Sequence, residues 1–303
     1  MALVNASTLV ALQKSFQVLF QTTLDSTQPA WPRPAMESPS ENAEENYQWL
    51  GRVPAMKEWL GSKTVEQLRG MSYLILNRDW ESTIGVKRNH IEDDMLGMYR
   101  PRIAELASEG ARHPDDLLST VRVAGNTATG LCYDGQQFYD MDHAEGDSGT
   151  QSNKLTGTGT TAAQVRADLF AAKAALRKFK DDRGKPYIRK MGTLDVIAVI
   201  PPDLEKTFDE LNNPALGSTT PKTPIDYEVD PYLTDVNDWY LDYVGGPVKP
   251  FIMQMRRRPI LVALEDPNSS ESVFLRQEFL YSVEARYNVG YGLWEYSILT
   301  TNT

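Results

Sequence analysis

Hydrophobic residues recur every three or four positions in the stretch from Ile91 to Gly110. The apolar positions are Ile91, Met95, Met98, Tyr99, Ile103 and Leu106. This spacing places them on one side of a helix with 3.6 residues per turn, so it predicts a long amphipathic helix from Ile91 to about Gly110 with one face buried. Pro101 cannot donate a helix hydrogen bond. We therefore expect either a bend there or two segments that meet at Arg100.

The same periodicity predicts further helices along the chain. An apolar stripe between Asn5 and Phe20 indicates a helix that needs a partner to bury it. The repeat from Ala162 to Lys180 predicts the clearest helix of the chain, and Thr161 with Gln164 forms a capping-box pattern at its start. Shorter helices are expected at Asp115–Val123 and Asp203–Leu211.

Strands are indicated by alternating or continuous apolar runs that turn residues separate. We expect a β-hairpin from residues 71–77 and 82–87, joined around Arg78, Asp79 and Trp80. The apolar run from Leu194 to Ile200 predicts a buried strand. Further strands are predicted at Leu131–Tyr139, Trp239–Val244, Phe251–Leu264 and Ser272–Leu299, the last broken at Gly290 and Gly292. Helices and strands occur in blocks, which is typical of an α+β fold.

Two segments near the N-terminus look suited to contacts with other molecules. Residues 26–46 are rich in Pro, Ser, Glu and Ala, which favours an extended arm. The following segment, Tyr47–Gly61, carries Trp49, Leu50, Trp59 and Leu60 among turn residues. Exposed aromatic residues commonly mark contact surfaces, although both tryptophans would also serve to cover their own domain.

Composition narrows the classes of function. The chain has 303 residues, a hydrophobic content of 41% and a formal net charge of −10, which indicates a globular protein without a basic surface for gripping phosphates. No apolar run is long enough to span a bilayer, and residues 1–10 lack the features of a secretory signal. Because Cys132 is the single cysteine, an intrachain disulfide framework and a multi-cysteine zinc site are excluded.

The only basic cluster is Arg256-Arg257-Arg258, which lies in an expected strand. Alternation would send Arg256 and Arg258 to one face and Arg257 to the other. A nucleic-acid site is one interpretation of this cluster. Solvated arginines, or arginines that form ion pairs between subunits, fit the acidic composition better.

Three patterns suggest chemistry but lack the context that each chemistry requires. Asp140, Asp142 and His143, with Glu145 nearby, resemble a metal site, yet an EF-hand loop counted from Asp140 lacks its required glycine and glutamate. Residues 157–162 match a dinucleotide-binding G-x-G-x-x-A pattern but follow polar residues instead of a buried strand. Cys132 could pair with His90, His113 or His143 only through the tertiary fold. We therefore assign no catalytic, metal or cofactor-binding residue.

Several short motifs, taken in order, resemble the Mu-like phage major head subunit family. They are Trp49-Leu50-Gly51, Lys57-Glu58-Trp59-Leu60-Gly61, Thr83-Ile84-Gly85-Val86, Ile91-Glu92-Asp93-Asp94, Phe138-Tyr139-Asp140 and Asp142-His143. The resemblance implies the tailed-phage major capsid fold, with an N-terminal arm, an extended β-hairpin loop, a peripheral domain that contains a long spine helix, and an axial domain. On this chain those parts would be residues 1–46, 47–88, 89–193 and 194–264, with residues 265–303 returning to the peripheral domain.

The resemblance also implies a structural function without enzymatic activity or cofactors. Such subunits form hexamers and pentamers of an icosahedral shell around double-stranded DNA, which they enclose without sequence-specific binding. The implied partners are further copies of the chain, a scaffold, a portal and decoration proteins; the implied location is the virion, with assembly in the host cytoplasm. We expect Trp49, Leu50, Trp59 and Leu60 to lie at a subunit interface. The alternatives are a metal-dependent enzyme that uses Asp140, Asp142 and His143, or a ring-forming tail or adaptor component.

Overall fold

The computed structural model describes residues 6–47, 72–93, 95–188, 191–214, 221–264 and 277–302. Its α-helices are α1 (Ala6–Ser26), α2 (Arg88–Glu92), α3 (Arg100–Ala124), α4 (Ala162–Lys178) and α5 (Glu205–Asn212). Its strands are β1 (Ala35–Pro39), β2 (Glu44–Asn46), β3 (Leu74–Leu76), β4 (Arg78–Lys87), β5 (Lys154–Thr156), β6 (Val196–Ile200), β7 (Asp226–Val229), β8 (Trp239–Tyr243), β9 (Phe251–Leu264), β10 (Glu278–Tyr291) and β11 (Ser297–Thr301). Short 3₁₀ turns lie at Met95–Met98, Thr193–Asp195, Pro202–Leu204 and Trp294–Tyr296.

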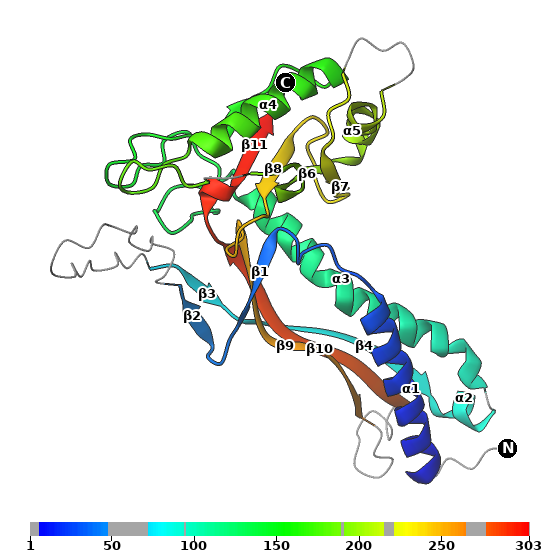
Figure 1. Cartoon of the computed structure of the whole chain (residues 1–303). Helices are drawn as coiled ribbons and strands as arrows, with labels where there is room; N and C mark the ends of the chain where they lie inside the picture. The colour runs from blue at the N-terminus through cyan, green and yellow to red at the C-terminus, as the bar shows by residue number, and fades with distance from the viewer. Residues whose placement is uncertain are drawn as a thin grey trace.

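These elements form two main sheets that the long helix α3 connects (Figure 1). The four-stranded sheet has the order β1-β9-β10-β4, in which β1 runs parallel to β9 and the other pairs are antiparallel. The five-stranded sheet has the order β5-β11-β8-β6-β7 and mixes parallel with antiparallel pairs. A separate two-stranded sheet pairs β2 with β3. This mixture confirms the predicted α+β class.

The five-stranded sheet is covered on both faces. Every residue of β6 and of β8 is buried, which requires packing above and below each strand. Helix α4 contributes Val165, Leu169 and Leu176 to this core. The predicted buried strand at residues 194–200 and the predicted helix at 162–180 are thus confirmed, and the expected capping box of Thr161 and Gln164 is present.

The four-stranded sheet is covered by helices on one face only. Along β10 the buried positions alternate with half-exposed ones, as expected for a strand with one face toward a core. The buried residues Phe279, Tyr281 and Val283 form a second core with α1 and α3, in which Phe16 of α1 contacts the ring of Tyr281 edge to face. Figure 1 shows both helices on the same side of β4, β9 and β10. The expected partner for the apolar stripe of the N-terminal helix is therefore the chain's own helix and sheet.

The long helix differs from its predicted position. It runs from Arg100 to Ala124, and the preceding residues form the separate short helix α2 and a 3₁₀ turn, so the expectation of two segments meeting at Arg100 is confirmed. Proline at the second helical position costs no hydrogen bond, because the first N–H groups of a helix have no partner within it. The predicted end near Gly110 is wrong, because the helix continues through Pro114. The expected separate helix at 115–123 is the second half of α3.

The predicted hairpin at residues 71–87 is also wrong. Residues 78–87 form one continuous strand that pairs with β10, whereas β3 pairs with β2. The turn signals at Arg78 and Asp79 lose to pairing with a partner about two hundred residues away in the sequence. The predicted strand at 131–139 is instead a loop with an isolated bridge between Leu131 and Gln137.

The chain crosses between the two main sheets more often than the sequence indicates. Part of the expected extended arm joins the four-stranded sheet as β1. The C-terminal stretch splits: β10 lies in the four-stranded sheet, while β11 pairs with β8 in the five-stranded sheet. Strand β9, which the domain division groups with residues 194–264, also lies in the four-stranded sheet. That division remains a prediction.

Candidate functional site

The predicted interface residues Trp49, Leu50, Trp59 and Leu60 lie outside the described residues. The residue that leads into this segment, Tyr47, is buried, and its hydroxyl donates to Gln254 Oε1 at 3.0 Å. The nearby base of the segment is the small sheet of β2 and β3. Whether the four apolar residues contact another subunit therefore remains a prediction.

The acidic group at residues 140–145 does not converge on one point. His143 is fully buried, stacks on the ring of Trp294 with centroids 4.0 Å apart, and hydrogen-bonds through Nδ1 to Asp134 Oδ2 at 2.7 Å. Asp142 is exposed, and Asp140 instead caps its own loop by accepting a bond from the Met141 backbone. The partner of the histidine is therefore Asp134, which the sequence reasoning missed.

Asp134 organises the loop after α3. Its Oδ1 accepts hydrogen bonds from the Cys132 thiol at 3.0 Å and from the backbone N–H of Gln136 at 3.0 Å. Burial by itself would raise the pKa of Asp134, but the hydrogen bonds from His143 and Cys132 outweigh it, so the pKa lies below its ordinary value. The Asp134-Gly135 dipeptide is a turn signal that would have marked this position in the sequence.

Cys132, Asp134 and His143 form the one group of three potential metal ligands within the described part of the chain. The contacts of Asp134 with the other two are hydrogen bonds of ordinary length, and together they satisfy both carboxylate oxygens. Burial is the main cause that raises the pKa of the Cys132 thiol, and Asp134 adds to it. The thiol is therefore protonated and unreactive at neutral pH, and the arrangement acts as a loop clamp.

The open face of the four-stranded sheet carries an apolar strip. Ile260, Val262 and Leu264 of β9 are 43%, 38% and 49% exposed. They alternate with Leu261 and Ala263, which pack toward α1 and α3, so the strip lies on the face that the helices leave uncovered. A row of three exposed aliphatic side chains on a regular strand is a feature of contact surfaces.

The three arginines of β9 have different environments. Arg257 pairs with Glu284 and Arg258 with Glu37, both within the chain. The strand register skips Arg256, because Met255 lies opposite Tyr287 and Arg257 opposite Arg286. A bulge of this kind redirects the extra side chain. Arg256 is exposed, without an ion-pair partner among the described residues.

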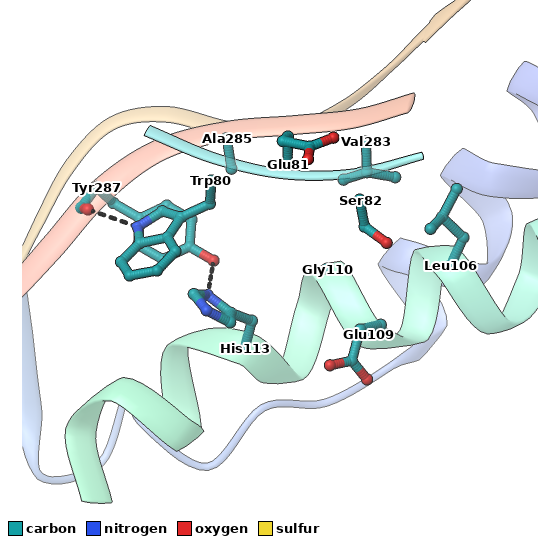
Figure 2. A pocket seen from close by; sticks show the side chains of 10 residues that line it. All are labelled: Trp80, Glu81, Ser82, Leu106, Glu109, Gly110, His113, Val283, Ala285 and Tyr287. Atoms are coloured by element: carbon teal, nitrogen blue, oxygen red, sulfur yellow. Dashed lines mark hydrogen bonds between the residues drawn. The ribbon is translucent and has the colours of Figure 1, made fainter. Parts of the chain in front are cut away.

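A cavity of about 240 Å³ opens between helix α3 and the edge strand β4 (Figure 2). Leu106, Val283 and Ala285 form its apolar lining. Trp80, His113 and Tyr287 close one end, while Glu81 and Glu109 add carboxylates to the lining.

Hydrogen bonds fix the aromatic end of this cavity. The indole N–H of Trp80 donates to the backbone oxygen of Tyr287 at 3.0 Å, and the Tyr287 hydroxyl lies 2.8 Å from His113 Nδ1. The rings of Trp80 and His113 are 4.5 Å apart. Burial lowers the pKa of His113 below its ordinary value, against the opposing influence of Asp116 and Glu109, so the imidazole is neutral at pH 7.

Sequence reasoning did not find this cavity, since its residues come from three separate regions of the chain. Trp80 and Tyr287 are 207 positions apart, and His113 and Tyr287 are 174 apart. The only local signal is a pair of small residues, Ser82 and Gly110, on elements that face each other.

Comparison with known proteins identifies the family. The family model described as the Mu-like prophage major head subunit gpT matches residues 9–165 and 231–303, which is most of the chain. The chain belongs to this family. It is therefore a structural head protein, the major capsid subunit of a Mu-like phage or prophage, as the resemblance of its motifs predicted.

Individual relatives agree with this assignment. The major capsid protein of Escherichia phage Mu is 28% identical over 299 residues, with 98% of this chain and 74% of that protein covered. The Mu-like prophage FluMu major head subunit of Haemophilus influenzae is 27% identical over 256 residues. That match covers 84% of this chain, which spans 61% of the FluMu protein's length.

A solved structure confirms the predicted fold. The subunit in the procapsid of bacteriophage JBD30 superposes with a TM-score of 0.62 at 27% identity, covering 99% of this chain and 77% of that one. The chain thus has the tailed-phage major capsid fold. The structure shows no helix, within its described part, that is long and apolar enough to cross a membrane.

Proposed function

We propose that this head subunit assembles with copies of itself, as hexamers and pentamers, into an icosahedral shell that encloses double-stranded DNA. The observation that carries the proposal is the family match across both the N-terminal and the C-terminal parts of the chain. The likeness to a procapsid subunit supports it, because that protein forms a closed particle.

Features of the subunit also support association. The apolar strip on β9 is exposed in the single chain, and burying it against another copy would remove apolar surface from water. Contacts between identical subunits that are individually weak become strong when they are repeated in a closed shell. The net charge of −10 suits a container wall that does not bind its DNA tightly.

We further propose that Trp49, Leu50, Trp59 and Leu60 contribute to the contacts between neighbouring subunits, as their sequence pattern suggests. Scaffold, portal and decoration proteins would be additional partners, with assembly in the host cytoplasm and the finished shell in the virion. DNA would be enclosed without recognition of its sequence.

Electron microscopy of the expressed protein tests the proposal. The chain would be produced alone and together with the scaffold protein of the same phage, and particles would be separated by sedimentation. Closed shells of uniform diameter are expected. Open rings of fixed size in both samples would instead favour a tail or adaptor component.

A double variant, Trp49→Ala with Trp59→Ala, tests the interface residues. We expect at least a tenfold lower yield of shells, together with an unfolding transition of the isolated subunit that matches the unsubstituted protein. An unchanged shell yield would show that neither tryptophan contributes to assembly.

A further inference from the structure

The cavity beside α3 results from two small residues on facing elements. On β4 the residues that point toward the helix are Trp80, Ser82, Ile84 and Val86. Val86 is buried and Ile84 packs against the core, but Ser82 is too short to reach the helix and remains exposed. A serine at a position where its neighbours are large and apolar leaves a gap in the wall of an otherwise packed helix–sheet layer.

Gly110 provides the other half of the gap. A Cβ added there would lie 3.3 Å from both Pro259 Cβ and Val283 Cγ1, so the glycine lets α3 approach the sheet closely. Glycine within a helix costs about 1 kcal/mol relative to alanine. The helix thus accepts a local cost at the point where the cavity lies, and the cavity opens at the edge strand of the sheet.

The charges around the cavity have one sign. Glu81 and Glu109 line it and are exposed, and no lysine or arginine is among the described residues that line it. The negative charge extends to its closed end. Asp116 and Glu109 push the pKa of His113 upward, and after burial they also contribute to the raised pKa of Tyr287.

An apolar lining with an acidic mouth matches the side chains of arginine and lysine. Their methylene groups pack on apolar surface while their charged ends bind carboxylates, and an arginine guanidinium also stacks on aromatic rings such as that of Trp80. We propose that this cavity receives an arginine or lysine side chain from a second copy of the chain in the assembled shell. This inference rests on the proposed shell function.

A second copy is the occupant that the chain's own features favour. The subunit belongs to a family of head proteins, so identical neighbours surround it at high local concentration. Its surface also offers cations of the required kind: Arg256 is displaced outward by a bulge and lacks an ion-pair partner in the described part of the chain. The cavity thus supplies unneutralised carboxylates, and the same surface supplies an unneutralised cation.

Thiol labelling at position 82 tests the occupancy directly. In the variant Ser82→Cys the new thiol would sit in the cavity, and the single native cysteine, Cys132, is buried with a pKa raised mainly by that burial, so it reacts slowly. The rate of maleimide labelling would be compared between free subunits and assembled shells. We expect labelling to be at least tenfold slower in shells. Equal rates would overturn the proposal.

Removing the charges at the mouth is the second test. The double variant Glu81→Gln with Glu109→Gln keeps the shape of the cavity but removes its carboxylates, and we expect at least a fivefold lower shell yield. The matched control is Glu105→Gln, which removes an exposed carboxylate of the same helix that lies outside the cavity and pairs with Arg102. Equal yields from the double variant and the control would overturn the proposal.

The two proposals fail in different ways. If the unsubstituted protein forms shells but the introduced thiol of Ser82→Cys reacts equally fast in shells and free subunits, the cavity inference fails and the shell function stands. If the unsubstituted protein forms no shells even with its scaffold, the shell function fails and the cavity inference falls with it.

Discussion

The two main sheets of this subunit are finished to different degrees. In the five-stranded sheet all residues of β6 and β8 are buried, and the ion pair of Arg122 with Asp242 lies inside at 2.7 Å with almost no exposure. In the four-stranded sheet one face packs on α1 and α3, while the other presents the strip of Ile260, Val262 and Leu264. The first region satisfies its surfaces within the chain, whereas the second leaves apolar surface and an acidic cavity open.

This difference indicates how a shell subunit divides its tasks. A closed core supplies the stability that the single chain needs before assembly. The open region keeps the surface that only neighbouring copies can cover. Substitutions in the closed region should therefore change folding, and substitutions on the open face should change assembly while folding stays intact.

The largest expected effect is in the closed region. Asp242→Asn would leave the Arg122 guanidinium buried without its counter-charge, and Arg122 Nη1 already has no hydrogen-bond partner. Breaking a buried ion pair from one side costs about 3–5 kcal/mol, so the subunit should lose that free energy of unfolding in urea titrations. The control Glu105→Gln removes an exposed ion pair and should have little effect. Similar losses for both variants would contradict the contrast.

A direct comparison of the regions uses two leucines. Leu241 of β8 is fully buried and Leu264 of β9 is 49% exposed. Leu241→Ala should cost about 2–5 kcal/mol of unfolding free energy, because it removes buried methyl groups and leaves a void. Leu264→Ala should cost less than about 0.5 kcal/mol but lower the shell yield. If Leu264→Ala unfolds as easily as Leu241→Ala, the face of the sheet is not open.

The close approach of α3 to the sheet gives a third prediction. Gly110→Val would place side-chain atoms against Pro259 and Val283, and such overpacking costs about 1–3 kcal/mol. Chemical denaturation should show this loss. Gly97→Ala is the control, because an added Cβ there meets no atom within 4 Å. A stable Gly110→Val variant would indicate that the helix can move away from the sheet at little cost.

The smallest expected effect is the pH dependence at His113. Burial lowers its pKa from the ordinary 6.5, so the folded state binds fewer protons than the unfolded state at mildly acidic pH. Stability is therefore complete above about pH 6.5 and falls as the pH drops toward the folded pKa. His113→Gln should show a smaller loss of unfolding free energy between about pH 7 and about pH 5 than the unsubstituted protein. The difference between the two proteins separates His113 from Asp115 and Glu228, whose raised pKa values act in the opposite direction.

Local patterns are sufficient where one element satisfies its own requirements. The helix α4 has its stripe and its capping box within one stretch of sequence, and that stretch predicts the helix nearly to its ends. The same holds for β6, whose continuous apolar run permits only a buried position. Order and spacing of short motifs are also enough to indicate the capsid family, which the family model confirms.

Tertiary structure decided the features that depend on distant partners. Strand β4 passes through an apparent turn because β10 offers a continuous ladder of hydrogen bonds, and α3 passes Gly110 and Pro114 because the sheet and α1 pack along it. Neither the pairing of His143 with Asp134 nor the cavity between α3 and β4 follows from spacing. The sequence by itself thus determined which segments are helical, extended or apolar, since those depend on local periodicity. Only the tertiary structure decided which surfaces were closed and which stayed open, because closure depends on contacts between residues far apart in the chain.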